Sequence, residues 1–219
     1  MGLRHRLLVP EIDSEMAKID WREIQDVLRR QGIRIGRGLS TREFTRIEKL
    51  HGFQFPPDLR DFLACGLPRG KEWPKWRRPA SNDVAFRLAW PTDGVLYDVR
   101  SGFWLSDWGK RPGTKDEACA FAEAACRDAP KLIPIYGHRY MPAEPCTPGN
   151  PVLSTYQTDI IYYGSDLRDY LQAEFVESRT VHDTSACRQV PLWSRIMDYE
   201  DDEDWQAWDE GNSGVECDA

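Results

Sequence analysis

The sequence lacks the short motifs that mark the common classes of enzyme active site. It contains no G-x-x-x-x-G-K-[ST] phosphate loop, no G-x-S-x-G nucleophile elbow, no H-E-x-x-H zinc motif and no dinucleotide-binding glycine fingerprint. Its 4 histidines do not cluster along the chain. We therefore expect no catalytic residues, no cofactor and no bound metal, while a triad assembled only in three dimensions stays open.

Long apolar runs and paired cysteine spacings are missing as well. The start of the chain holds only Leu7-Leu8-Val9 as an apolar run, whereas a membrane-spanning helix needs about 18 apolar residues. We therefore expect a cytoplasmic protein without membrane contact. None of the 6 cysteines forms a C-x-x-C pair, although Cys119 and Cys126 are spaced to share a helix face. The spacing favours small core residues with free thiols over a zinc site or a disulfide.

Basic residues are absent from the C-terminal end. Residues 198–219 contain ten acidic side chains and no Lys or Arg. Because the whole chain carries −7, residues 1–197 carry +3. With 41% apolar residues the chain can bury one core, so we expect one domain over residues 12–197 and an acidic, disordered tail over 198–219.

The first third of the chain carries clear helix signals. Asp20 with Glu23, and Ser40 with Glu43, each match a capping box that precedes apolar residues at helical spacing. Pro56-Pro57 suits the first turn of a further helix, which Gly66 ends. The pattern predicts a first helix up to Gly32, followed by two short helices within 40–66 that an aromatic connector joins.

The rest of the chain favours strands over helices. Residues 67–83 resemble a loop, and Val84–Trp90 fits either a helix or a strand. Helices are expected at Thr114–Asp128 and Asp166–Phe175. Strands are expected at Val95–Val99, Gly102–Trp104, Leu132–Tyr136, Val152–Tyr156 and Ile160–Tyr163. This order predicts an α+β fold with one central, mostly antiparallel sheet flanked by helices.

One stretch resembles a known protein family. It reads Leu39-Ser40-x-x-Glu43-x-x-x-Ile47-Glu48-x-x-x-Gly52-x-x-x-Pro56-Pro57-Asp58-Leu59-Arg60-x-Phe62-Leu63. This pattern is similar to the opening block of the SUKH superfamily, which includes bacterial toxin-immunity proteins and yeast cell-wall-synthesis regulators. Later segments resemble its bacterial branch: Leu88–Pro91, Gly102–Trp104, Leu132–Tyr136, His138–Tyr140, Gln157–Gly164 and Pro191–Ser194.

The resemblance implies an α+β fold and a protein-binding role. Its bacterial members are commonly immunity proteins that neutralise secreted toxins, often nucleases. The expected function is therefore a non-enzymatic binding module, either an immunity protein or an adaptor in a cytosolic complex. Its partner would be a protein, such as a basic toxin domain. The alternative is a small-ligand-binding or hydrolytic protein that uses a polar pocket around His138 and Asp159.

Polar and aromatic residues near the expected strand ends form the first candidate site. Its members are Tyr136, His138, Arg139, Tyr140, Gln157, Asp159, Tyr162 and Tyr163. An Arg–Asp pair with a histidine can hold a ligand or a partner side chain. Alternatively, the same residues form a buried polar network that fixes strand register.

Two further segments are candidates. The loop Arg69–Arg78 interleaves basic residues with Trp73 and Trp76, which suits either single-stranded nucleic acid, a protein partner or packing onto the domain. We expect the tryptophans to pack onto the domain, and among partners a protein rather than a nucleic acid. The acidic tail carries Trp205 and Trp208, which can dock on a basic partner or simply belong to a solubilising end.

Overall fold

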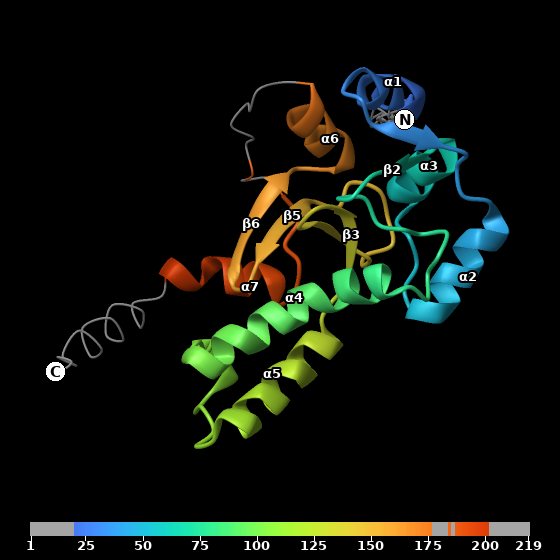
Figure 1. Cartoon of the computed structure of the whole chain (residues 1–219). Helices are drawn as coiled ribbons and strands as arrows, with labels where there is room; N and C mark the ends of the chain where they lie inside the picture. The colour runs from blue at the N-terminus through green and yellow to red at the C-terminus, as the bar shows by residue number, and fades with distance from the viewer. Residues whose placement is uncertain (1–19, 177–183, 185–186, 202–219) are drawn as a thin grey trace, which may run out of the picture.

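A four-stranded antiparallel sheet lies at the centre of the computed structural model, which describes residues 20–176, 184 and 187–201. Its strands follow the chain order β3 (Leu132–Tyr136), β4 (Arg139–Pro142), β5 (Val152–Tyr156) and β6 (Asp159–Gly164). Short hairpin turns join β3 to β4 and β5 to β6 at the same end of the sheet. Figure 1 shows α4 and α5 on one side of this sheet and α6 on the other, which confirms the predicted α+β class.

The helices predicted in the first third of the chain are present. They are α1 (Trp21–Arg30), α2 (Thr41–His51) and α3 (Pro57–Cys65). Ser40 and Glu43 form the complete reciprocal capping box. Asp20 caps α1 through the Arg22 N–H instead.

A second, two-stranded sheet was not predicted. It pairs β1 (Arg34–Gly36) with β2 (Leu67–Arg69) in antiparallel register. Each strand is only three residues long, too short for a period-two pattern to show in the sequence. The expected loop 67–83 therefore begins with a strand, and the described residues form two sheets rather than one.

The strands expected at Val95–Val99 and Gly102–Trp104 are wrong. Residues Asn82–Ser101 form a single helix, α4, which continues through Pro91. A short 3-10 turn, η1 (Ser106–Trp108), then leads to the predicted helix α5 (Lys115–Asp128). Pro91 is the physical reason for the error, because proline inside a helix removes one backbone hydrogen bond and usually ends the helix.

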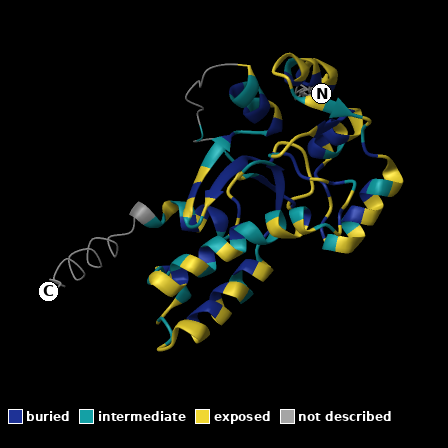
Figure 2. Cartoon of the chain, viewed as in Figure 1, coloured by how far each residue is buried: buried dark blue, intermediate teal, exposed yellow. Residues whose placement is uncertain are grey.

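The remaining helices close both faces of the central sheet. They are α6 (Leu167–Phe175) and α7 (Trp193–Met197), and a 3-10 turn, η2 (Asp198–Asp201), follows. Ile133 and Met141 pack in one core cluster with Leu28, Phe62 and Tyr170 of α1, α3 and α6. Another cluster contains Leu132, Tyr140, Leu153, Val95, Ala122 and Trp193, which joins the opposite sheet face to α4, α5 and α7. Figure 2 shows the strands as mainly buried, with buried and exposed positions alternating along α4 and α5.

The cysteines agree only in part with the expectation of buried core residues with free thiols. The five described cysteines form no disulfide with one another, as expected. Cys119 and Cys126 are buried on α5, but Cys65 and Cys146 are exposed, so the core interpretation is wrong for those two. Within the described residues, no helix combines the length and apolarity that crossing a membrane requires.

The sheet repairs the interruption that Pro91 makes in α4. Because Pro91 has no N–H, the carbonyl of Arg87 one turn earlier loses its helical donor. The hydroxyl of Tyr140 on β4 donates to this carbonyl at 2.8 Å. Burial raises the pKa of Tyr140, which keeps its hydroxyl protonated and able to donate. The helix therefore continues past Pro91 because the Tyr140 hydroxyl of β4 replaces the missing hydrogen-bond donor.

Phe62 provides a test of the first core cluster. Its side chain is completely buried on α3 and packs edge-on against Trp21, with ring centroids 5.6 Å apart. Phe62→Ala is expected to lower the free energy of unfolding by about 3–5 kcal/mol, the usual cost of the lost contacts and the cavity. Urea denaturation measures this loss, and a change well below about 1 kcal/mol would contradict the burial of Phe62 in the core.

Tyr140→Phe tests the repair of α4. The substitution keeps the ring but leaves the Arg87 carbonyl without its donor, so unfolding should cost about 1–3 kcal/mol less. Tyr97→Phe is the matched control, because Tyr97 is exposed on the same helix and should lose almost nothing. Equal midpoints for the two variants in chemical denaturation would show that the Tyr140 hydroxyl does not support the helix.

Candidate functional site

Six of the eight residues predicted around the strand ends are buried or half-buried. The Tyr136 ring lies 4.9 Å from Trp73, between centroids. Arg139 donates to the Ser154 hydroxyl at 3.0 Å and lies 3.7 Å from the centroid of Tyr163. Tyr136, Arg139 and Tyr163 therefore pack beneath α6, where they contribute to the core.

Tyr140 and Tyr162 lie on the opposite face of the sheet. Tyr140 is buried under α4, as described above. The Tyr162 hydroxyl hydrogen-bonds to Ser194 of α7 at 2.7 Å. The structure therefore divides the predicted cluster between two faces and does not assemble it as one pocket.

His138 and Asp159 do not form the buried network that was one expectation. Both side chains are exposed, one at the β3–β4 turn and the other at the start of β6. Partial desolvation and the neighbouring Arg139 lower the pKa of His138. The two residues share one end of the sheet because the turns do, and they are available there as surface groups.

Gln157 has a backbone role in the β5–β6 turn. It adopts a positive φ of 58°, and its backbone lies against Gly94 of α4. The next residue, Thr158, donates from both its N–H and its hydroxyl to Asp98, at 2.9 and 2.7 Å. The turn is thus fixed onto α4.

Trp205 and Trp208 lie outside the described residues, as does the tail from residue 202 onward. The described structure extends helically past the expected boundary at 197, and Tyr199 packs on Phe103 with a centroid distance of 4.6 Å. Among the residues that the structure describes, no group of three or more His, Cys, Asp or Glu side chains is arranged to hold a metal ion.

The basic loop Arg69–Arg78 does not present its tryptophans for stacking. Trp73 and Trp76 are both buried. Trp73 stacks on Phe175, and Trp76 packs edge-on against Phe55. The interpretation of these rings as packing onto the domain is confirmed, and a nucleic-acid platform at this loop is wrong because its aromatic faces are already covered.

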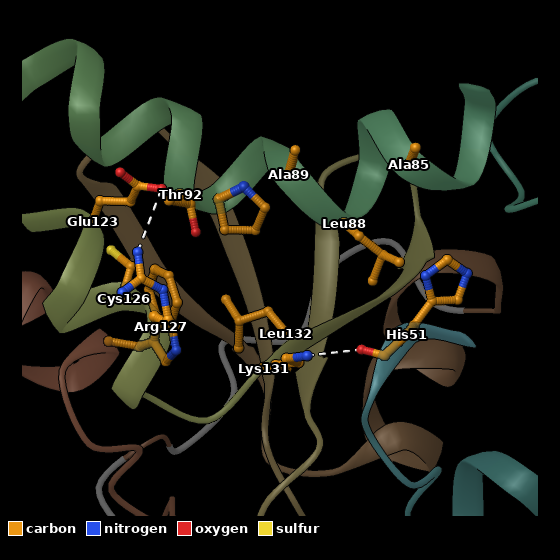
Figure 3. A pocket seen from close by; sticks show the side chains of 12 residues that line it. His51, Ala85, Leu88, Ala89, Thr92, Glu123, Cys126, Arg127, Lys131 and Leu132 are labelled. Carbon is orange, nitrogen blue, oxygen red and sulfur yellow. Dashed lines mark hydrogen bonds and ion pairs between the residues drawn. The ribbon is translucent and has the colours of Figure 1, made fainter. Parts of the chain in front are cut away.

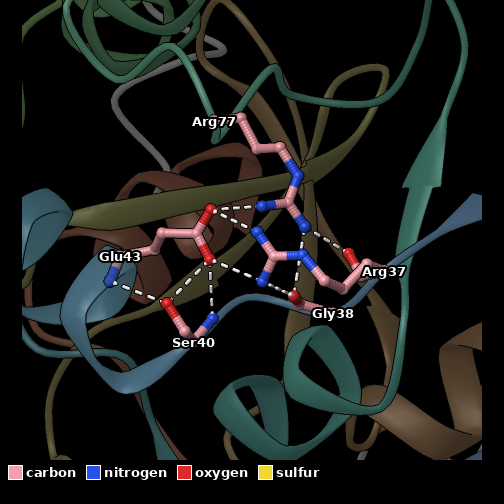
Figure 4. Close-up of polar contacts among 5 residues, drawn as sticks. All are labelled: Arg37, Gly38, Ser40, Glu43 and Arg77. Carbon is pink, nitrogen blue, oxygen red and sulfur yellow. Dashed lines mark hydrogen bonds and ion pairs between the residues drawn. The ribbon is translucent and has the colours of Figure 1, made fainter.

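The basic side chain of Arg77 is held by the α2 cap. Figure 4 shows Arg77 and Arg37 converging on the Glu43 carboxylate, while Ser40 closes the capping box. Arg37 binds both carboxylate oxygens, at 3.1 and 3.2 Å. Arg77 also donates to the carbonyls of Arg37 and Gly38. This arrangement joins the basic loop to the segment before α2, a structural role for the motif that resembles the SUKH block.

The most exposed aromatic surface lies along α4 and was not predicted. Phe86, Trp90, Asp93 and Tyr97 fall within an arc of about 60° at 3.6 residues per turn. Phe86 and Tyr97 are 60% and 61% exposed. Tyr156 of β5, 57% exposed, extends this stripe toward the hairpin, with its ring 6.3 Å from Trp90. We call Phe86, Trp90, Tyr97 and Tyr156 the aromatic face.

Hydrogen bonds to backbone carbonyls fix Trp90 of the aromatic face and attach α4 to the hairpin turns. Trp90 Nε1 donates to the Thr155 carbonyl at 3.1 Å, which fixes its indole beside Tyr156. Arg87 donates to the Gly137 carbonyl of the other hairpin turn at 3.2 Å. Two exposed carboxylates, Asp93 and Asp159, stand on α4 and on the hairpin that carries Tyr156. The face therefore combines a fixed indole with exposed rings, and two exposed carboxylates stand beside it.

Comparison with protein-family models, curated proteins and solved structures finds no match. The resemblance of residues 39–63 to the SUKH superfamily thus stays a prediction based on the motif.

Glu43 gives a pH-dependent test of the junction before α2. The Ser40 backbone N–H is the largest influence that lowers its pKa, and Arg37 adds to it, so the pKa falls from 4.5 to about 2. A lowered pKa means that the stabilisation is complete above pH 4.5 and is lost as the pH falls toward 2. Glu43→Gln should therefore reduce stability at pH 7, by about 1 kcal/mol because the ion pairs are screened.

The same variant should flatten the pH dependence of unfolding between pH 4.5 and about 2. Urea unfolding of both proteins at pH 7 and at pH 3 measures the difference. A stability gap that stays the same at the two pH values would contradict an ionised Glu43 as the source of the stabilisation.

Proposed function

We propose that this chain is a non-enzymatic protein-binding module whose partner docks on the aromatic face. The observation that carries the proposal is the set of aromatic rings on one side of α4, with Phe86 and Tyr97 exposed and Trp90 half-buried, which exposed Tyr156 extends. Large aromatic side chains dominate the energetics of protein interfaces, and rigid ones lose little entropy on binding. Trp90 and its carbonyl partner supply that rigidity.

The finer proposal is an immunity protein that neutralises a basic toxin domain. Its support is the motif resemblance together with charge. Asp93 and Asp159 flank the aromatic face, and residues 198–219 carry ten acidic residues and no basic ones. A nuclease toxin has a basic cleft because its substrate is a polyanion. Negative charge beside the docking face would speed association with such a cleft.

The alternative, a ligand-binding or hydrolytic pocket around His138 and Asp159, has less support. General acid–base catalysis needs side chains held within hydrogen-bond reach of a reacting atom, usually with water excluded. His138 and Asp159 are both exposed, and the ring of Tyr140 between them in sequence lies on the buried side of β4. Their position favours contact with a large partner surface.

The proposal is tested by binding with paired surface variants. Phe86→Ser combined with Tyr156→Ser removes two exposed rings that bury little, so the protein should keep its stability. Affinity for a toxin domain encoded beside this gene, measured by calorimetry, should fall at least about a hundredfold, the loss of about two hot-spot residues. In cells that express this toxin, the wild-type chain should restore growth and the double variant should not.

Phe121→Ser is the matched control, since Phe121 is also an exposed aromatic residue but lies on α5. It should bind and protect like the wild type. Loss of binding in Phe121→Ser with retention in the double variant would place the interface elsewhere. A substrate turned over by the purified protein, with activity abolished by His138→Ala, would contradict the non-enzymatic proposal itself.

A further inference from the structure

A pocket of about 420 Å³ lies on the flank of α4 that faces away from the β5–β6 turn. It is bounded by α4, α5, the start of β3 and the end of α2, as Figure 3 shows. Ligand-binding pockets of proteins span about 300–1,000 Å³, so the space suits a small molecule. None of its lining residues belongs to the aromatic face.

The floor of the pocket is apolar and fixed. Leu88 of α4, Leu132 of β3 and the indole of Trp193 contribute to it. Leu132 and Trp193 are buried in the second core cluster. The Trp193 N–H is already bonded to the Pro130 carbonyl at 2.8 Å, which fixes the buried indole at the base of the pocket. This floor has no polar group that would orient a sugar or a nucleobase.

The rim of the pocket is cationic. Lys131 and Arg127 stand on it with a single carboxylate, Glu123, so one positive charge is uncompensated. Lys131 Nζ donates to the His51 carbonyl at 2.7 Å, which holds the ammonium in place and leaves two of its three donors unused by that bond. Arg127 lies 3.6 Å from Glu123, and a guanidinium has five donors, so it too can bind a further acceptor.

The remaining polar groups of the pocket are neutral or occupied. Burial raises the pKa of Cys126 to about 11, so its thiol is not a nucleophile at neutral pH. Burial also lowers the pKa of His51, whose Nε2 lies 3.0 Å from the Pro79 carbonyl. The side chains of the pocket therefore suit the binding of a ligand and not a catalytic reaction.

We infer that this pocket binds a small amphipathic monoanion, a carboxylate with an apolar body. The apolar body would lie on Leu88, Leu132 and Trp193, and the carboxylate would meet Lys131 and Arg127 at the rim. A single uncompensated positive charge suits a monoanion better than a phosphate, which carries more negative charge at neutral pH. The inference is independent of the proposed protein-binding function, because it uses a different surface.

Calorimetric titration with decanoate, below its micelle concentration, tests the inference on the full-length chain. Decanoate should bind saturably with one site. Lys131→Gln and Arg127→Gln should each weaken binding about tenfold, and Ala89→Phe, which places a ring in the pocket, should abolish it. Lys110→Gln is the matched control, because Lys110 is an exposed cation outside the pocket. It should bind as the wild type does.

Two chemical controls complete the test. Decanol and decyltrimethylammonium share the apolar body without the negative charge, and both should bind at least about tenfold more weakly than decanoate. Thermal unfolding of each variant checks that it is folded, and the three pocket variants provide separate readouts if one is not. No saturable binding of decanoate to the wild type would overturn the inference. So would binding that Ala89→Phe and the charge variants leave unchanged.

Discussion

The attachment of α4 to the hairpin ends of the central sheet organises the rest of the molecule. Pro91 interrupts the hydrogen bonding of the helix, and the Tyr140 hydroxyl replaces the missing donor at the Arg87 carbonyl. Two turns further along, Asp98 accepts two hydrogen bonds from Thr158. These contacts set both the position and the rotation of α4, since they lie near its middle and near its C-terminal end.

Both binding surfaces inferred above depend on that rotation. With its buried side fixed on the sheet by Val95 and Val99, α4 must present Phe86, Asp93 and Tyr97 to solvent. The same rotation places Leu88 and Ala89 along the pocket that α5 and Lys131 also line. One helix thus carries both the aromatic face and one wall of the pocket. The two surfaces both lie on α4, but no side chain belongs to both.

The sequence reveals local structure better than it reveals these surfaces. Ser40 with Glu43 and the Pro56-Pro57 pair predict their helices, because capping and proline placement act within a few residues. Phe86, Trp90 and Tyr97 of the aromatic face follow helical spacing. Pro91 argues against a helix there, because the donor that replaces its missing N–H comes from Tyr140, far along the chain. The pocket joins Lys131 to His51 across 80 residues, and no local pattern encodes that contact.

Gly94→Ala tests the attachment of α4 most directly, because two physical effects predict opposite signs. Alanine inside a helix ordinarily stabilises it by about 0.5–1 kcal/mol relative to glycine. Here the new Cβ would stand 2.8 Å from the Gln157 Cα, closer than backbone atoms tolerate. The attachment therefore predicts a less stable protein, with faster amide hydrogen exchange in both α4 and the β5–β6 turn. A more stable protein with unchanged exchange would show that α4 is not held against the hairpin in this way.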